Sequence, residues 1–197
     1  MKTRRLFAVI LPVFLLFACT DDTPKQENNN EEVTVDVEDT KSNITDVFSS
    51  KEFGFSVEFP ENPVPGSQDV PTEIGNLKLN TFMHDAGSQV YFVAISNMPK
   101  LMTGLSDKGD MLDGGVSGML EQFSKVEILK KEEIKIDGHP GRLVEATGIT
   151  SGIEVYNRAN IYLVGNKFYQ VYVLAEKAKA DKEAIEAFIS SFTLIEK

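Results

Sequence analysis

Two segments near the C-terminus, IEVYNRANIYLV (153–164) and KFYQVYVLA (167–175), constrain the fold more than any other feature of the chain. Successive side chains of a β-strand point to opposite faces of the sheet, and these segments are apolar on both faces. In the first segment one face holds Tyr156, Tyr162 and Val164, and the other holds Ile153, Val155, Ile161 and Leu163. The pair Gly165-Asn166 between the segments predicts a hairpin. A sheet that contains these strands must therefore be covered on both faces.

Further strand patterns precede these two segments. They lie at 54–60, 75–85, 89–99, 125–136 and 141–149. The tripeptide Ala86-Gly87-Ser88 separates two of them and predicts a second hairpin. With 197 residues, of which 42% are hydrophobic, the chain can form one core but hardly two, so we expect a single folded domain over residues 48–197.

Two helices are predicted within this domain. Over 106–125 the apolar residues follow helical spacing, with Ser106 as the N-cap; they are Leu112, Val116, Met119, Leu120 and Phe123. The glycines of this segment, Gly114, Gly115 and Gly118, predict close packing of the helix on the sheet. Over 180–192 a second apolar stripe consists of Ile185, Phe188, Ile189 and Phe192. The expected fold is α+β, an antiparallel sheet of six or seven strands sandwiched between helices.

The N-terminus has the pattern of a signal peptide. Basic residues are followed by an apolar run from Leu6 to Ala18, which at 13 residues is too short to span a bilayer as a helix. The run ends in Leu16-Phe17-Ala18-Cys19, which resembles the lipobox of bacterial lipoproteins. This resemblance implies that residues 1–18 are removed, with Leu16 and Ala18 recognised by the signal peptidase. It also implies that Cys19, the single cysteine, carries acyl chains that anchor the protein to a membrane.

The segment after Cys19 is strongly acidic. Residues 20–47 hold nine Asp or Glu against two Lys, a balance of −7, and no aromatic residue. Such a composition buries too little apolar surface to fold, so residues 19–47 are interpreted as a disordered tether with the lipidated cysteine at its start. Residue 20 is Thr rather than the Asp of inner-membrane lipoproteins that the sequence resembles. We therefore expect a lipid-anchored envelope protein, on the periplasmic or surface face of the outer membrane if the cell is Gram-negative.

The folded domain resembles a known family. The order of its elements, together with FGFSVEFP (53–60), DGHPGR (137–142), YLVGNKFYQVYV (162–173) and FISSFTL (188–194), is similar to the PsbP-like superfamily, which includes DcrB-like envelope lipoproteins. The resemblance implies the sandwiched antiparallel sheet, and members of the superfamily bind partner proteins or have no assigned role. It carries no shared catalytic residues.

The residue content argues against several kinds of chemistry. The net charge of −10 and the lack of a Lys/Arg cluster after residue 5 disfavour nucleic acid as a partner. The two histidines, His84 and His139, have no nucleophile motif beside them, so we expect neither an enzyme nor catalytic residues. Asp107, Asp110 and Asp113 lack the spacing of a calcium loop and are interpreted as an acidic first helical turn. No metal site and no cofactor are expected.

Three residues remain as candidates for a partner contact. Arg142 and Arg158 are the only arginines after the signal peptide, and His139 lies in the Asp137-Gly138 turn. The arginines either form ion pairs with Glu145 and Glu154 or share a contact with an anion or a partner. His139 is expected at the solvent-exposed tip of a hairpin.

The expected function is therefore that of a lipid-anchored, non-enzymatic binding or assembly-accessory protein whose partner is another envelope protein. The alternative is a lipoprotein that binds a small ligand or a metal ion.

Overall fold

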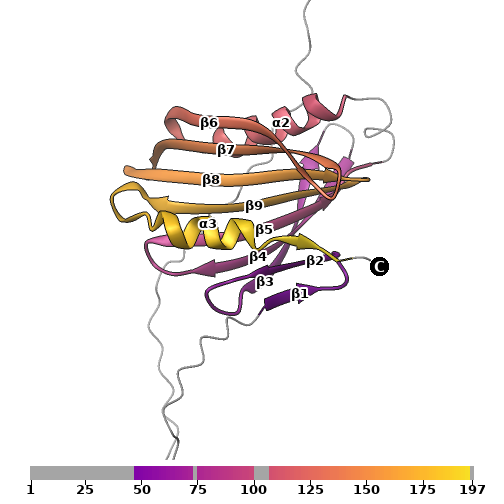
Figure 1. Cartoon of the computed structure of the whole chain (residues 1–197). Coiled ribbons are helices and arrows are strands. Elements are labelled where there is room, and N and C mark those ends of the chain that lie inside the picture. The colour runs from indigo at the N-terminus through magenta and orange to yellow at the C-terminus, as the bar shows by residue number, and fades with distance from the viewer. Residues whose placement is uncertain (1–46, 73–74, 100–106, 196–197) are drawn as a thin grey trace, which may run out of the picture. The chain divides into compact units, whose positions relative to one another are not determined.

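Figure 1 shows a large sheet with helix α2 and helix α3, and a small sheet that includes β1 and β2. The computed structural model describes residues 47–72, 75–99 and 107–195. The strands are β1 (Val47–Ser50), β2 (Phe55–Glu58), β3 (Val64–Thr72), β4 (Gly75–Asp85), β5 (Gln89–Asn97), β6 (Ser124–Ile136), β7 (His139–Thr150), β8 (Ile153–Val164), β9 (Lys167–Glu176) and β10 (Thr193–Leu194). The helices are α2 (Lys108–Leu120), α3 (Lys182–Ser190) and the 3-10 turn η1 (Lys177–Lys179). Within these ranges, no helix has the length and apolar character needed to cross a membrane.

The large sheet contains seven strands in the order β3-β4-β5-β9-β8-β7-β6, and every neighbouring pair is antiparallel. The prediction of six or seven antiparallel strands is confirmed. Both predicted hairpins form, β4–β5 through residues 86–88 and β8–β9 through Gly165 and Asn166. Strand β8 lies near the middle and buries Tyr162 on one face and Ile161 on the other, as its double alternation predicted.

Strand β3 was not expected, because its sequence VPGSQDVPT contains two prolines and a glycine. Its place at one edge of the sheet explains why the prolines are tolerated. Proline cannot donate to a neighbouring strand, and an edge strand has neighbours on one side only. Strand β3 pairs with β4 over its whole length.

The two faces of the sheet are covered differently. Helix α2 packs over β7 and β8 on one face, with Leu112 and Val116 fully buried. The opposite face is covered by α3 together with a three-stranded sheet, β1-β2-β10, from which Phe55 and Val57 enter the core. The prediction of a sheet sandwiched between helices is thus only partly right, because a small sheet forms half of one cover. Strand β1 begins at Val47, the last residue of the predicted tether.

Local signals fix the ends and the packing of α2. Ser106, the predicted N-cap, lies outside the described residues; the side chain of Asp107 caps the helix by accepting from the backbone N–H groups of Gly109 and Asp110. A carboxylate suits this end because it meets unpaired N–H groups and the positive end of the helix dipole. A Cβ on Gly115 would lie 2.3 Å from the ring of Phe168, so the predicted close packing of this glycine on the sheet is confirmed.

Candidate functional site

The DGHPGR stretch forms the turn between β6 and β7. Asp137 (φ 46°) and Gly138 (φ 79°) are its two central residues, as a two-residue hairpin requires. The predicted hairpin is confirmed, but His139 does not lie at its tip. His139 pairs with Ile136 as the first residue of β7 and is half-buried. Its side chain points toward the face of the sheet that α3 covers, where Ile134 and Ile136 also pack.

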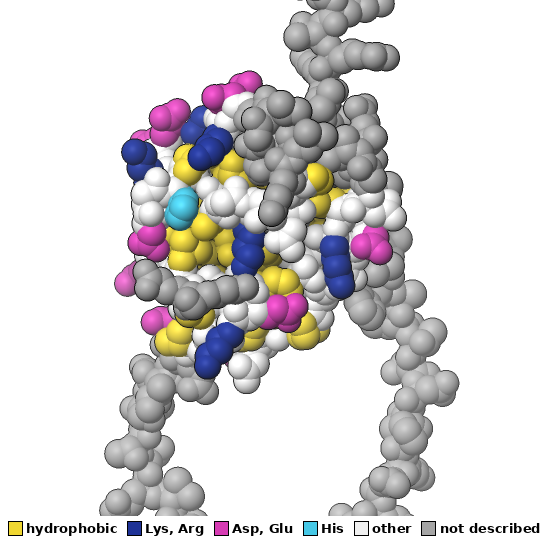
Figure 2. All heavy atoms as spheres, turned by 90° about the vertical axis from the view of Figure 1, so that its right-hand side faces the viewer, with side chains coloured by type: hydrophobic (Ala, Val, Ile, Leu, Met, Phe, Trp, Pro, Cys, Tyr) yellow, Lys and Arg dark blue, Asp and Glu magenta, His cyan; other side chains and the backbone are white. Residues whose placement is uncertain are grey.

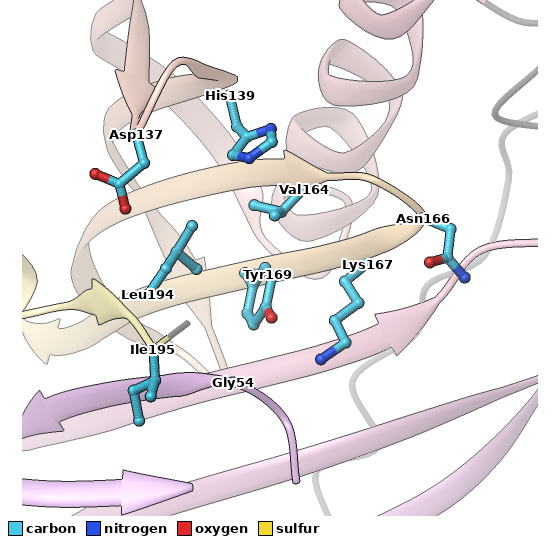
Figure 3. Close-up of a pocket in the computed structure, with 9 residues that line it drawn as sticks. All are labelled: Gly54, Asp137, His139, Val164, Asn166, Lys167, Tyr169, Leu194 and Ile195. Atoms are coloured by element: carbon cyan, nitrogen blue, oxygen red, sulfur yellow. The ribbon is translucent and has the colours of Figure 1, made fainter. Parts of the chain in front are cut away.

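A pocket of about 470 Å³ opens beside this hairpin, at the end of the sheet where β7 and β9 begin and β8 ends. It is lined by Gly54, Asp137, His139, Val164, Asn166, Lys167, Tyr169, Leu194 and Ile195 (Figure 3). In Figure 3, Asp137 and Lys167 lie toward opposite sides of the pocket, with Val164 and Tyr169 between them. The view onto this end of the domain shows hydrophobic side chains gathered in its middle, with a histidine and basic side chains around them (Figure 2).

Lys167 and Tyr169 are held by the same acceptor. The Nζ of Lys167 and the hydroxyl of Tyr169 each donate to the backbone oxygen of Phe53 at 2.7 Å. Burial raises the pKa of Tyr169 to about 12, so the phenol stays neutral at ordinary pH. The next residue, Gly54, is also hydrogen-bonded, because its backbone oxygen accepts from the N–H of Ile195. These bonds fasten the β1–β2 loop and the end of the chain to β9.

The two histidines are far from forming a joint site. His84 lies on β4 opposite Tyr91, with ring centroids 6.0 Å apart, and does not line the pocket. Its neighbour Asp85 accepts from the N–H of Gly87 and stabilises the β4–β5 turn. Among the described residues, no group of three or more His, Cys, Asp or Glu side chains is placed to hold a metal ion.

Arg142 and Arg158 lie on opposite faces of the sheet, so they do not share a contact. Arg142 is paired with Ile161 in register and reaches α2, where its Nε donates to the carboxylate of Asp113 at 2.9 Å. Burial raises the pKa of Asp113, but the hydrogen bonds and charges of Arg142 and Lys131 outweigh it, and the pKa is lowered overall.

Arg158 is almost fully buried on the α3 face. Its guanidinium binds both carboxylate oxygens of Glu186 on α3, at 2.7 and 3.2 Å, and donates to Asn160 Oδ1 at 2.7 Å. Glu145, a predicted partner, is 4.0 Å away. Glu154, the other predicted partner, instead pairs with Lys177. Arg158 therefore fastens α3 to the sheet.

Sequence reasoning identified the hairpin but missed the other walls of the pocket. Because β7, β8 and β9 are joined by tight turns, the turns at Asp137-Gly138 and Gly165-Asn166 must fall at the same end of the sheet. That topology could have placed Asn166 and Lys167 beside His139. The approach of Leu194 and Ile195 depends on the small sheet, which the sequence patterns did not predict.

Comparison with known proteins is consistent with this architecture. No curated protein matches the chain. Among solved structures, the chain is similar to cyanobacterial PsbP (CyanoP) from Synechocystis sp. PCC 6803, with a TM-score of 0.51 and 14% identity over 80% of this chain and 97% of that one. Weaker similarities are found to a protein of unknown function from Pseudomonas aeruginosa (TM-score 0.40, 13% identity, 67% and 83% coverage). The T6SS immunity protein TplEi from Pseudomonas aeruginosa is similar at a TM-score of 0.39 (14% identity, 72% and 58% coverage).

The first of these similarities supports the fold alone, since the sequences are so different. The sequence model described as PsbP-like protein matches residues 5–194, nearly the whole chain, and the protein therefore belongs to the PsbP-like family.

Proposed function

We propose that this protein is a lipid-anchored protein of the bacterial cell envelope that acts by binding another envelope protein, without catalysing a reaction. Membership of the PsbP-like family supports a non-catalytic accessory module in general. The anchor is proposed from the Leu16-Phe17-Ala18-Cys19 sequence. Both Cys19 and the tether up to residue 46 lie outside the described residues, so the tether too is part of the proposal; a chain of this length that lacks fixed structure has an r.m.s. span of roughly 30 Å.

One observation carries the non-catalytic part of this proposal. Two polar side chains of the pocket, Lys167 and Tyr169, both donate to the backbone oxygen of Phe53. Catalysis at neutral pH favours a group whose pKa lies near the working pH, whereas burial moves the pKa of Tyr169 in the opposite direction, to about 12. The two side chains thus maintain the architecture of this end of the domain. A protein that binds its partner without a chemical reaction needs a stable surface of this kind and no activated side chain.

Crosslinking in intact envelopes tests the binding role. A photo-crosslinking amino acid is placed at exposed sites of the domain, and crosslinked products are identified by mass spectrometry. We expect one envelope protein to be recovered repeatedly from a limited set of neighbouring sites. Diffuse crosslinking to abundant proteins, with no preference among sites, would count against a specific partner.

The pocket favours a second candidate, the binding of a small ligand. Its polar side chains include Lys167, Asp137 and Asn166. Its apolar wall is formed by Val164, Leu194 and Ile195. A thermal-shift screen of divalent metals, small carboxylates and amino acids tests this candidate. Binding in the pocket predicts a shift that His139→Ala abolishes and that His84→Ala, outside the pocket, leaves unchanged. A flat screen, or a shift that both variants retain, would reject it.

A further inference from the structure

Strand β6 is the last strand of the large sheet, and its outer side has no neighbour among the described residues. Helix α2 packs mainly over β7 and β8 and reaches β6 through the ion pair of Asp113 with Lys131 at 2.9 Å, and α3 packs over β8, β9 and β2. Ten residues of β6 in succession, from Ser124 to Glu133, are exposed. They include the apolar side chains of Val126, Ile128 and Leu129, at 39%, 50% and 49% exposure. A long exposed edge of this kind can accept a further strand.

The two halves of β6 differ in regularity. Register shifts interrupt the pairing with β7 between Ser124 and Glu127 and between Ile128 and Lys130, and bulges of this kind blunt an edge. From Lys130 to Ile136 the register is unbroken. This half also contains no proline or glycine, in contrast to β3 at the other edge, where Pro65 lacks an N–H group. The segment 130–136 is therefore the competent part of the edge.

The turn determines which backbone groups point outward. In a two-residue hairpin the residues that flank the turn form a hydrogen-bonded pair, here Ile136 and His139. Hydrogen-bonded and non-bonded positions alternate along an antiparallel strand. The N–H and C=O groups of Lys131, Glu133 and Lys135 are consequently directed away from β7.

The side chains of the same segment restrict what can pair with it. The register with β7 and β8 places Lys130, Glu132, Ile134 and Ile136 on the α3 face and Lys131, Glu133 and Lys135 on the α2 face. If a second copy of β6 pairs antiparallel about a twofold axis normal to the sheet, residues on the same face must stand opposite each other. Registers centred on Lys131, Glu132, Glu133 or Lys135 each put a residue opposite its own like charge, which destabilises pairing.

The register centred on Ile134 has no such conflict. Ile134 stands opposite its own copy, and Glu133 stands opposite Lys135 of the other copy, twice by symmetry. These are also positions whose backbone groups point outward, so the register that the charges select is compatible with hydrogen bonding between the two strands.

We propose that two copies of this chain associate through antiparallel pairing of their β6 strands, centred on Ile134, to form one continuous sheet. The occupant of the edge is a second copy because the charge order of the segment is complementary to itself. The inference does not depend on the lipid anchor or on another envelope protein. The paired segment is short, which predicts a weak dimer that is best detected by covalent trapping.

Cysteine trapping tests the register directly. The full chain is used with Cys19→Ala, which removes the only native cysteine. In the proposed dimer, Cα atoms at position 134 are about 4.5 Å apart, within the range of a disulfide. We expect Ile134→Cys to give a disulfide-linked dimer on mild oxidation. Lys130→Cys is the matched control. In the same register the two copies of position 130 are eight residues apart along the strands, about 26 Å, which is too far for a disulfide. Equal trapping at both positions, or no trapping at 134, would overturn the proposal.

Charge reversal supplies a second test that does not require a disulfide. Glu133→Lys and Lys135→Glu each create two like-charge pairs, and each is expected to raise the dimer dissociation constant about tenfold. The double variant restores opposite charges and should restore wild-type association. Sedimentation measures the dimer, and far-UV circular dichroism confirms that each variant is folded. If the single variants associate like the wild type, or the double variant fails to recover, β6 is not the interface as proposed.

Discussion

Gly141, the glycine of the HPGR sequence, should be required by the close approach of β8. A Cβ at this position would lie 2.6 Å from the backbone oxygen of Ile161 and 2.6 Å from the ring of Tyr162. The oxygen belongs to a central strand and cannot swing aside. The ring is 6% exposed, stacks on Phe192 at 5.9 Å between centroids, and accepts a hydrogen bond from Asn160 through its hydroxyl. Neither neighbour can move without disturbing other contacts.

For Gly141→Ala, we therefore expect a cost near the upper end of overpacking, about 3 kcal/mol. The loss of unfolded-state entropy on replacing glycine offsets about 0.5–1 kcal/mol of this. The net expectation is a free energy of unfolding about 2 kcal/mol lower, and a Tm about 4–8 °C lower for a domain of this size. Urea denaturation followed by circular dichroism measures it, with an unchanged m-value.

Gly138 is the matched control, three residues away in the turn. Its φ is 79°, and a Cβ there would meet nothing within 4 Å. Gly138→Ala should cost only the left-handed backbone conformation, about 1 kcal/mol, and Gly138→Asn should cost little. If Gly141→Ala unfolds at the same urea concentration as the wild type, or is no worse than Gly138→Ala, steric contact with β8 is not the reason for the glycine.

Arg158, the tyrosines and Asp113 can each be tested by substitution or by titration. Arg158→Ala removes an almost fully buried side chain together with its hydrogen bonds to Glu186 and Asn160, and should lower the free energy of unfolding by about 3 kcal/mol in urea titrations. Glu186→Gln keeps a hydrogen-bond acceptor for the guanidinium, with Glu145 4.0 Å away, and should cost only about 1 kcal/mol. All five tyrosines have a pKa raised above 10.0, chiefly by burial. Their contribution to the free energy of unfolding is therefore fully present below pH 10 and is lost as the pH rises through the raised pKa values. Absorbance at 295 nm should show little phenolate before the protein unfolds, and tyrosines that titrate near pH 10 in the folded protein would refute this. The lowered pKa of Asp113 contributes stability that is present above pH 3.8 and is lost as the pH falls through the lowered value. Asp113→Asn should remove this contribution, under about 1 kcal/mol, and should make the free energy of unfolding depend less on pH at the acidic end. An unchanged pH dependence in this range would exclude the contribution.

The central part of the fold was predictable because its strands carry their own signals. Apolar alternation on both faces of β8, and the turns that flank it, are local features that the final packing reinforces. Strand β3 escaped prediction because its prolines oppose strand formation everywhere except at an edge. Strand β10 has only two residues, too few to show an alternating apolar pattern in the sequence. It is defined by its pairing with β2.

The candidate site was less predictable, for a physical reason. The DGHPGR turn was evident, but the use of Lys167 and Tyr169 to hold the oxygen of Phe53 joins residues more than 110 positions apart. Of the two glutamates predicted as partners of the arginines, Glu145 lies 4.0 Å from Arg158, whereas Glu154 pairs with Lys177. The shorter contact of Arg158, at 2.7 Å to Glu186, was not predicted because it requires the docking of α3, which depends on tertiary packing.

The proposed anchor is the claim on which the cellular role depends most, and Cys19 tests it most directly. The mature protein is purified from membranes of cells that produce it, and its N-terminal peptide is analysed by mass spectrometry. The account predicts that this peptide begins at Cys19 and carries acyl chains, and that the Cys19→Ala protein leaves the membrane fraction. An unmodified cysteine, or unchanged membrane association of the Cys19→Ala protein, would contradict it.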